Sequence, residues 1–159
     1  MQATASWEVG QIAPDFKLKG PGGQFITLSE FRGKKNVLLV FYPLAFSPVC
    51  SHQLPAIQKD LGRFEALDTE VLGISVDSYY ANEAFALHLG LSFPLLSDFK
   101  RQTSTEYGVL IADRLYSERA LFLVDRAGKI AYRDVSPNLG DIPSNDPVFE
   151  ALERLRQPS

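Results

Sequence analysis

The sequence has little cysteine and no long apolar run. These two shortages argue against a disulfide-linked protein and against a membrane-spanning one. Cys50 is the one cysteine among 159 residues, so no disulfide can form within the chain. Its longest apolar stretches, such as "NVLLVFY" at 36–42, are far shorter than the roughly 20 residues of a membrane-spanning helix. The opening "MQATASWEVG" lacks the basic and apolar segments of a secretory signal. We therefore expect a cytoplasmic protein with no membrane partner.

A strong excess of charge is also missing. The net charge is −3, and the 16 basic residues form no block, so we expect no nucleic-acid partner. Two histidines and one cysteine without ligand spacing argue against a metal site. No repeat, low-complexity tract or linker interrupts the chain, and its length suits one domain covering 1–159.

Hydrophobic patterning predicts a succession of strands. The segment 15–28, "DFKLKGPGGQFITL", is typical of a hairpin with a glycine-rich turn. The other predicted strands are short, mainly apolar runs, at 36–42, 71–76, 93–98, 120–124 and 129–133. The last two are joined by "DRAG" and predict a second hairpin.

Helical spacing appears between these strands. From Pro48 onward one apolar stripe is predicted, made of Leu54, Ile57, Leu61 and Phe64. Helices are also expected at 77–90, with Asp77 or Ser78 as cap and Gly90 as stop, at 101–108, and from Asp146, with Val148, Leu152 and Leu155 on one face. The order of elements predicts a layered α/β fold with a parallel, right-handed central crossover.

Cys50 lies where the first central strand gives way to its helix, at the edge where chemistry gathers in open α/β sheets. Ser47 is the predicted N-cap and Pro48 the first helical residue, which puts Cys50 in the first turn. Unpaired backbone N–H groups and the positive end of the helix dipole favour a thiolate there. Pro55 predicts a kink just after this site.

Ionisation alone does not make a fast thiol enzyme. Lowering a cysteine pKa from ~8.5 to ~6 raises the thiolate fraction near neutral pH only about 30-fold. Donors aimed at the developing charge are needed as well, and an arginine suits this role. His52 is disfavoured as a base for Cys50, because residues i and i+2 of a helix point to different faces. On residue types alone, a monothiol disulfide exchanger and a binding module with an inert, buried cysteine remain alternatives.

The run "PLAFSPVC" resembles the Pro-x-x-x-Thr/Ser-x-x-Cys pattern of peroxiredoxins, with Pro43, Ser47 and Cys50 at the fixed positions. "VGQIAPDFKL" is similar to the usual opening of that family, and "FPLLSD" to its segment after the second helix. "SERALFLVDRAGKI" resembles the stretch that supplies the active-site arginine, Arg119 here. Among subgroups, the chain is most similar to the one-cysteine AhpE-like peroxiredoxins of the AhpC/TSA family.

This resemblance implies a thioredoxin-like fold, with a mixed central sheet flanked by helices and an N-terminal β-hairpin. It implies a thiol-dependent peroxidase that reduces hydrogen peroxide or alkyl hydroperoxides, without a metal or organic cofactor. Cys50 would attack the hydroperoxide and become a sulfenic acid. Ser47 and Arg119 would hydrogen-bond the sulfur and the peroxide oxygens, and Pro43 would shield the pocket from water. A homodimer is also implied, with Phe46 at a subunit interface or pocket wall.

Two positions depart from the family pattern. Gln53 stands where many relatives carry Glu, although an amide oxygen can still accept a hydrogen bond from an arginine. Pro55 stands where some relatives place a resolving cysteine. With one cysteine in the sequence, we expect the sulfenic acid to be reduced by an external thiol, which is a low-molecular-weight thiol, a redoxin or the Cys50 of a second copy.

Overall fold

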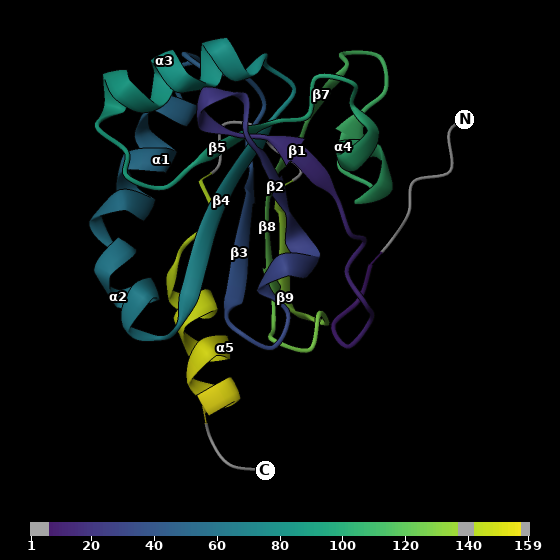
Figure 1. Cartoon of the computed structure of the whole chain (residues 1–159), viewed down its shortest axis with the longest axis vertical. Helices are drawn as coiled ribbons and strands as arrows, with labels where there is room; N and C mark the ends of the chain where they lie inside the picture. Colours follow the sequence, from purple (N-terminus) through teal and green to yellow (C-terminus); the bar gives the residue numbers. More distant parts are fainter. Residues whose placement is uncertain (1–6, 137–141, 157–159) are drawn as a thin grey trace.

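The computed structural model describes residues 7–136 and 142–156. A mixed sheet of seven strands, in the order β2-β1-β5-β4-β3-β8-β9, runs through it (Figure 1). Its strands are β1 (Lys17–Lys19), β2 (Phe25–Thr27), β3 (Asn36–Phe41), β4 (Thr69–Ser75), β5 (Leu95–Ser97), β8 (Arg119–Val124) and β9 (Ile130–Ser136). A separate two-stranded ribbon pairs β6 (Leu110–Ile111) with β7 (Tyr116–Ser117).

Helices connect and cover these strands. The α-helices are α1 (Cys50–Lys59), α2 (Leu61–Ala66), α3 (Tyr79–Leu89), α4 (Gln102–Glu106) and α5 (Asp146–Arg156). Short 3₁₀ turns are η1 (Pro21–Gly23), inside the N-terminal hairpin, and η2 (Leu28–Phe31). None of the helices within 7–136 and 142–156 is long and apolar enough to cross a bilayer.

Strand β3 is the centre of the core. It pairs in parallel with β4 and antiparallel with β8, and all six of its residues are buried. Because side chains alternate across a strand, Leu38 and Val40 enter one apolar cluster, while Val37, Leu39 and Phe41 enter another on the opposite face. A continuous apolar run is therefore the expected sequence of a strand covered on both sides.

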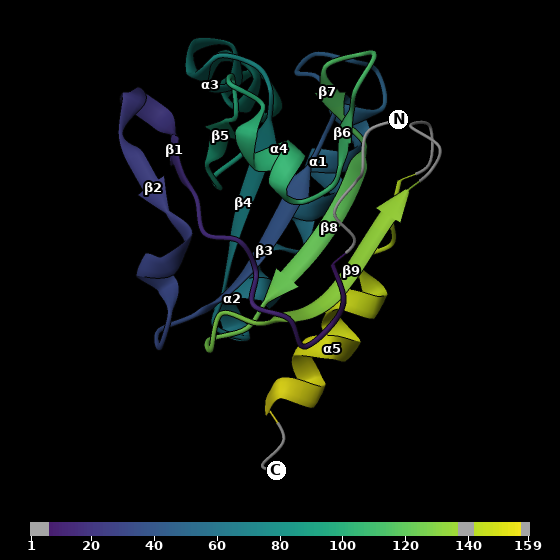
Figure 2. The same cartoon turned by 90° about the vertical axis from the view of Figure 1, so that its right-hand side faces the viewer.

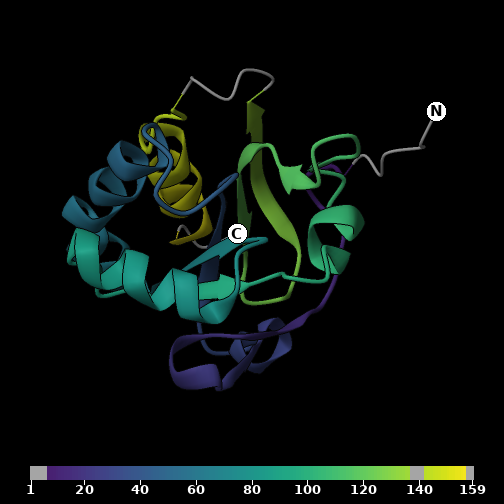
Figure 3. The ribbon, with the colours of Figure 1, turned by 90° about the horizontal axis from the view of Figure 1, so that it is seen from above.

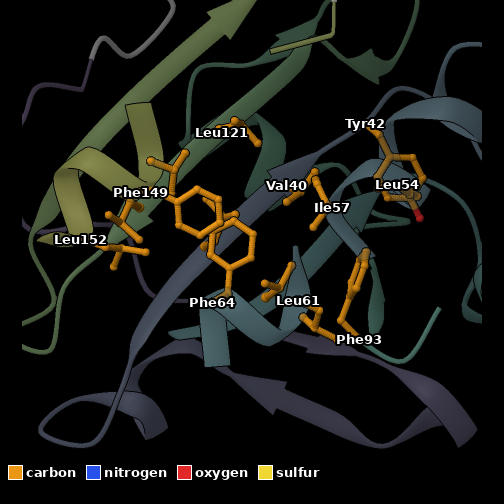
Figure 4. Packing of buried hydrophobic residues seen from close by; sticks show 14 of the residues in the cluster. Val40, Tyr42, Leu54, Ile57, Leu61, Phe64, Phe93, Leu121, Phe149 and Leu152 are labelled. Carbon is orange, nitrogen blue, oxygen red and sulfur yellow. The ribbon is translucent and has the colours of Figure 1, made fainter. Parts of the chain in front are cut away.

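Helices α1, α2, α3 and α5 lie on one side of the sheet and α4 on the other, as the view from above shows (Figure 3). The apolar stripe Leu54, Ile57, Leu61 and Phe64 is buried in the first cluster, as its spacing predicts. Phe64 stacks on Phe149 of α5 with ring centroids 4.4 Å apart (Figure 4). The second face is filled by Phe16, Leu28 and Tyr107.

The predicted strands, both hairpins and the parallel crossover are confirmed. Ser78 is the N-cap of α3, accepting a hydrogen bond from the Ala81 N–H, and Gly90 ends the helix at φ 69. The single helix predicted after Pro48 is instead two helices. Pro55 lies inside α1, and the interruption falls at Asp60 between α1 and α2.

Two further details differ from prediction. Leu155 is 40% exposed, so the buried face of α5 is made of Val148, Phe149, Ala151 and Leu152 instead. The ribbon of β6 and β7 was not predicted, because two-residue strands carry too little pattern to recognise.

Strand direction decides which residues share an edge of the sheet. Because β3 and β4 are parallel, the chain leaves both at the same edge, after Phe41 and after Ser75. Since β8 runs antiparallel to β3, it begins at that edge, with Ala120 opposite Phe41. In Figure 2 the start of β8 lies at the same end of the molecule as α3 and the ribbon of β6 and β7. Arg119 is thereby brought to the end of β3.

Candidate active site

Residues 42–49 join β3 to α1, and we call them the reactive loop. Its first residue extends the parallel pairing, since the Tyr42 N–H donates to the Ile74 carbonyl at 3.1 Å. The Tyr42 carbonyl accepts from Ser117 Oγ at 3.2 Å. Pro43, the next residue, is buried. The loop therefore starts from a fixed point at the centre of the sheet edge.

The predicted cap at Ser47 is wrong. Its hydroxyl donates to the Leu44 carbonyl at 2.9 Å, and α1 has no side-chain cap. Pro48 and Val49 form a turn, in which the His52 N–H bonds the Val49 carbonyl at 3.1 Å. Helix α1 consequently begins at Cys50 rather than at Pro48.

Cys50 remains in the first turn of α1, where the argument for thiolate stabilisation applies. The Ser51 N–H bonds the Ser47 carbonyl at 3.1 Å, so the backbone of the reactive loop leads directly into the helix. Gln53 follows Cys50 at spacing i, i+3, which places both positions on one face of α1. His52 is exposed.

Arg119 is buried beside Gln53. Both side chains are almost inaccessible, at 2% and 1% exposed, and Arg119 Nη1 donates to Gln53 Oε1 at 2.6 Å. Because a guanidinium has only donors, this bond also fixes the orientation of the amide, with Oε1 toward the arginine. The expectation that the amide oxygen of Gln53 can accept a hydrogen bond from an arginine is confirmed. Gln53 Nε2 is buried and has no partner among the described residues.

Two other arginines close to Arg119 in the sequence lie elsewhere in the fold. Arg114 is exposed, and its Nη1 donates to the Tyr116 hydroxyl at 3.2 Å. Arg126 follows the opposite end of β8 and pairs with Asp68 at 2.8 Å. Arg119 is therefore the arginine that the fold places next to α1. Burial raises the pKa of the carboxyl of its neighbour Glu118.

Phe46 has an unusual backbone. Its φ is 66°, in the left-handed region that costs a non-glycine residue on the order of 1–3 kcal/mol. The ring packs on Phe85 at 4.9 Å and on His88 at 5.7 Å between centroids, while 52% of the residue stays exposed. This contact joins the reactive loop to His88, which lies in the last turn of α3.

A buried polar network behind the loop could not be read from the sequence. Tyr42, fully buried, donates its hydroxyl to Asn82 Oδ1 at 2.5 Å, and Asn82 Nδ2 donates to the Leu96 carbonyl at 3.2 Å. Ser75 Oγ donates to Asp77 Oδ2 at 2.7 Å, and the same oxygen accepts from the Ala45 N–H at 2.8 Å. Polar residues at the ends of β4 and α3 therefore support the reactive loop.

The site is suited to thiol chemistry with an oxygen-containing substrate. It combines a helix-start cysteine with a guanidinium held in a dry environment, where donors interact most strongly with developing charge. Across the described part of the chain, no group of three or more histidine, cysteine or acidic residues is arranged to hold a metal ion.

Comparison with known proteins identifies the family of the chain. Residues 9–133 match the AhpC/TSA family. The chain is 41% identical over 129 residues to alkyl hydroperoxide reductase E of Mycobacterium tuberculosis, covering 80% of this chain and 84% of the relative. It is 39% identical over 158 residues to the chloroplastic 2-Cys peroxiredoxin BAS1 of Spinacia oleracea. That match covers 93% of this chain, which spans 59% of the length of the spinach protein.

Solved structures show the same fold. The reduced 2-Cys peroxiredoxin of Plasmodium vivax superposes with a TM-score of 0.85 at 36% identity, covering 93% of this chain and 81% of that one. Mycobacterium tuberculosis AhpC gives a TM-score of 0.83 at 30% identity, with 94% and 93% covered. The thioredoxin-like fold predicted from the sequence is confirmed. By sequence and by structure, the chain belongs to the AhpC/TSA family of peroxiredoxins.

Proposed function

We propose that this protein is a thiol-dependent peroxidase that reduces hydrogen peroxide or alkyl hydroperoxides through Cys50. The observation that carries the proposal is the placement of Arg119, buried and hydrogen-bonded to Gln53, next to the helix that begins with Cys50. An inert, buried cysteine would not need a guanidinium next to its helix, and burying a guanidinium costs several kcal/mol unless it is well hydrogen-bonded.

In the proposed reaction the Cys50 thiolate attacks one oxygen of the hydroperoxide. The S–O bond forms as the O–O bond breaks, and the departing hydroxide or alkoxide takes up a proton to leave as water or alcohol. Sulfur is oxidised to a sulfenic acid and the peroxide is reduced. We assign Arg119 to stabilise the charge on the departing oxygen, and the buried Pro43 to limit water at the site. The Ser47 hydroxyl donates to the Leu44 carbonyl in this structure, so we assign it to turn from that carbonyl and donate to the bound peroxide.

We propose an external thiol or redoxin as the reductant, because the sequence holds a single cysteine. Its thiolate attacks the sulfenic sulfur, expelling the oxygen as water and forming a mixed disulfide. A second thiol then attacks the disulfide and releases reduced Cys50.

A homodimer in the cytoplasm is the setting we propose for this chemistry. Exposed apolar side chains near the reactive loop support the dimer, with Leu44 37%, Phe46 52% and Leu87 85% exposed.

The proposal is tested by rapid mixing of the reduced protein with hydrogen peroxide and with a bulkier alkyl hydroperoxide. We expect both reactions to be faster by orders of magnitude than that of free cysteine, and Cys50→Ser to abolish them. A model disulfide offered side by side tests the exchanger alternative. A protein that reacts faster with the disulfide than with either peroxide, or a Cys50→Ser variant that keeps peroxidase activity, contradicts the proposal.

A further inference from the structure

Asp77, a residue outside the motif of Pro43, Ser47, Cys50 and Arg119, ties down the middle of the reactive loop. The Ala45 N–H donates to Asp77 Oδ2 at 2.8 Å. Ser75 Oγ donates to the same oxygen at 2.7 Å, and the Asp77 carbonyl accepts from Ser97 Oγ at 2.6 Å. Ser75, at the end of β4, thus fixes the carboxylate, and Ser97, at the end of β5, fixes the Asp77 backbone.

We call the hydrogen bond from the Ala45 N–H to Asp77 the anchor of the loop, and the next residue, Phe46, has a strained backbone. Phe46 has a φ of 66°, and a non-glycine residue keeps such a conformation only where its surroundings hold it. The bond from Ala45 holds the chain before Phe46, and the ring contact with Phe85 at 4.9 Å holds the side chain itself.

The strained turn leads directly to the site. The Ser47 N–H and Oγ both donate to the Leu44 carbonyl, at 3.4 and 2.9 Å, so the backbone doubles back between Leu44 and Ser47. Helix α1 starts three positions later with Cys50. Any shift of this turn therefore moves Ser47 and the backbone of Cys50. Arg119 does not move with them, because it belongs to strand β8.

We propose that Asp77 is a positioning residue for peroxide reduction. Its carboxylate holds the reactive loop in the strained turn that sets Ser47 and the start of α1 against Arg119. Asp77 acts through the Ala45 N–H and not on the substrate. The inference rests on the peroxidase function proposed above. Since small misplacements of reacting groups cost large factors in rate, losing the anchor should slow the peroxide reaction more than it affects simple thiol reactivity.

The test compares Asp77→Ala, which removes the acceptor, with Asp77→Asn, which keeps a carbonyl oxygen for the Ala45 N–H. Glu83→Ala is the matched control. Glu83 Oε2 also accepts a backbone N–H, from Gly22 at 3.0 Å, but away from the reactive loop. Each folded variant is assayed for its rate with hydrogen peroxide and for alkylation of Cys50 by iodoacetamide, which needs the thiolate but no oxygen-directed donors.

We expect Asp77→Ala to slow the peroxide reaction about tenfold or more while alkylation stays within about threefold of the parent. Asp77→Asn and Glu83→Ala should both keep peroxide rates within about threefold. The inference is overturned if Asp77→Ala retains the parent rate, if peroxide reaction and alkylation fall together, or if Asp77→Asn is as slow as Asp77→Ala.

Hydrogen exchange of the peptide 42–49 tests the anchor without catalysis. Asp77→Ala should speed amide exchange there and Glu83→Ala should not, and unchanged exchange in Asp77→Ala refutes the anchor. A parent protein that does not reduce peroxides refutes the proposed function instead, and leaves the anchor to be judged by exchange alone.

Discussion

Arg119 is a large charged side chain in the protein interior, where a charge loses its favourable hydration. At 2% exposed it has lost nearly all contact with water, and removing a guanidinium from water costs several kcal/mol before hydrogen bonds offset it. The bond to Gln53 Oε1 at 2.6 Å offsets part of this cost. Buried ions contribute little net stability, so the benefit of keeping this one is better sought in the chemistry of the site.

Arg119→Lys tests that interpretation. The lysine keeps the positive charge but loses the planar fork of donors, so we expect the second-order rate with hydrogen peroxide to fall about 10- to 100-fold. Stopped-flow kinetics measures the rate, and circular dichroism confirms that the variant is folded.

Arg114→Lys is the matched control, because Arg114 is exposed and bonds the Tyr116 hydroxyl at 3.2 Å. Its rate should equal that of the parent. An Arg119→Lys variant with the parent rate would remove Arg119 from the mechanism.

Helix α4 shows how a buried acid caps an element. Asp98 is 1% exposed, and its two carboxylate oxygens accept from the Thr103 N–H at 3.1 Å and the Ser104 N–H at 2.7 Å. Burial raises the pKa of Asp98 above its usual 3.8, although the hydrogen bonds to Ser104 and Thr103 act in the opposite direction. The folded protein therefore binds the Asp98 proton more tightly than the unfolded chain does.

This shift predicts a pH dependence of stability. The contribution of Asp98 to the free energy of unfolding is fully present below pH 3.8. It is lost as the pH rises through the higher pKa that Asp98 has in the folded state. Asp98→Asn cannot titrate, so above pH 3.8 the free energy of unfolding should fall less steeply with rising pH in the variant than in the parent. Urea unfolding at several pH values measures both slopes, and an unchanged slope in the variant contradicts the assignment.

The elements themselves were largely predictable from local pattern. The apolar run 36–42 specified β3, and the stripe Leu54, Ile57, Leu61 and Phe64 specified the buried face of α1 and α2. What failed was decided by contacts that spacing does not encode. Ser47 has the right chemistry for an N-cap, but its hydroxyl bonds the Leu44 carbonyl, and the helix begins later.

At the scale of the whole molecule, the site depends on sheet topology. Arg119 and Gln53 are 66 residues apart, and they meet because β8 begins where β3 ends. The resemblance to peroxiredoxins identified Arg119, since residue types alone did not distinguish it from Arg114 or Arg126. The anchor from Asp77 to Ala45 had no signal in the sequence, because it joins a strand end to a loop that are paired only in the folded chain.

The most direct test of the central claim is the intact mass of the reduced protein after one equivalent of hydrogen peroxide in the absence of thiol. Peptide mapping then locates the change. We predict the gain of one oxygen on Cys50, followed by conversion to a mixed disulfide when a small thiol is added. An unmodified Cys50, or oxygen found only on Met1 or Trp7, would contradict the account.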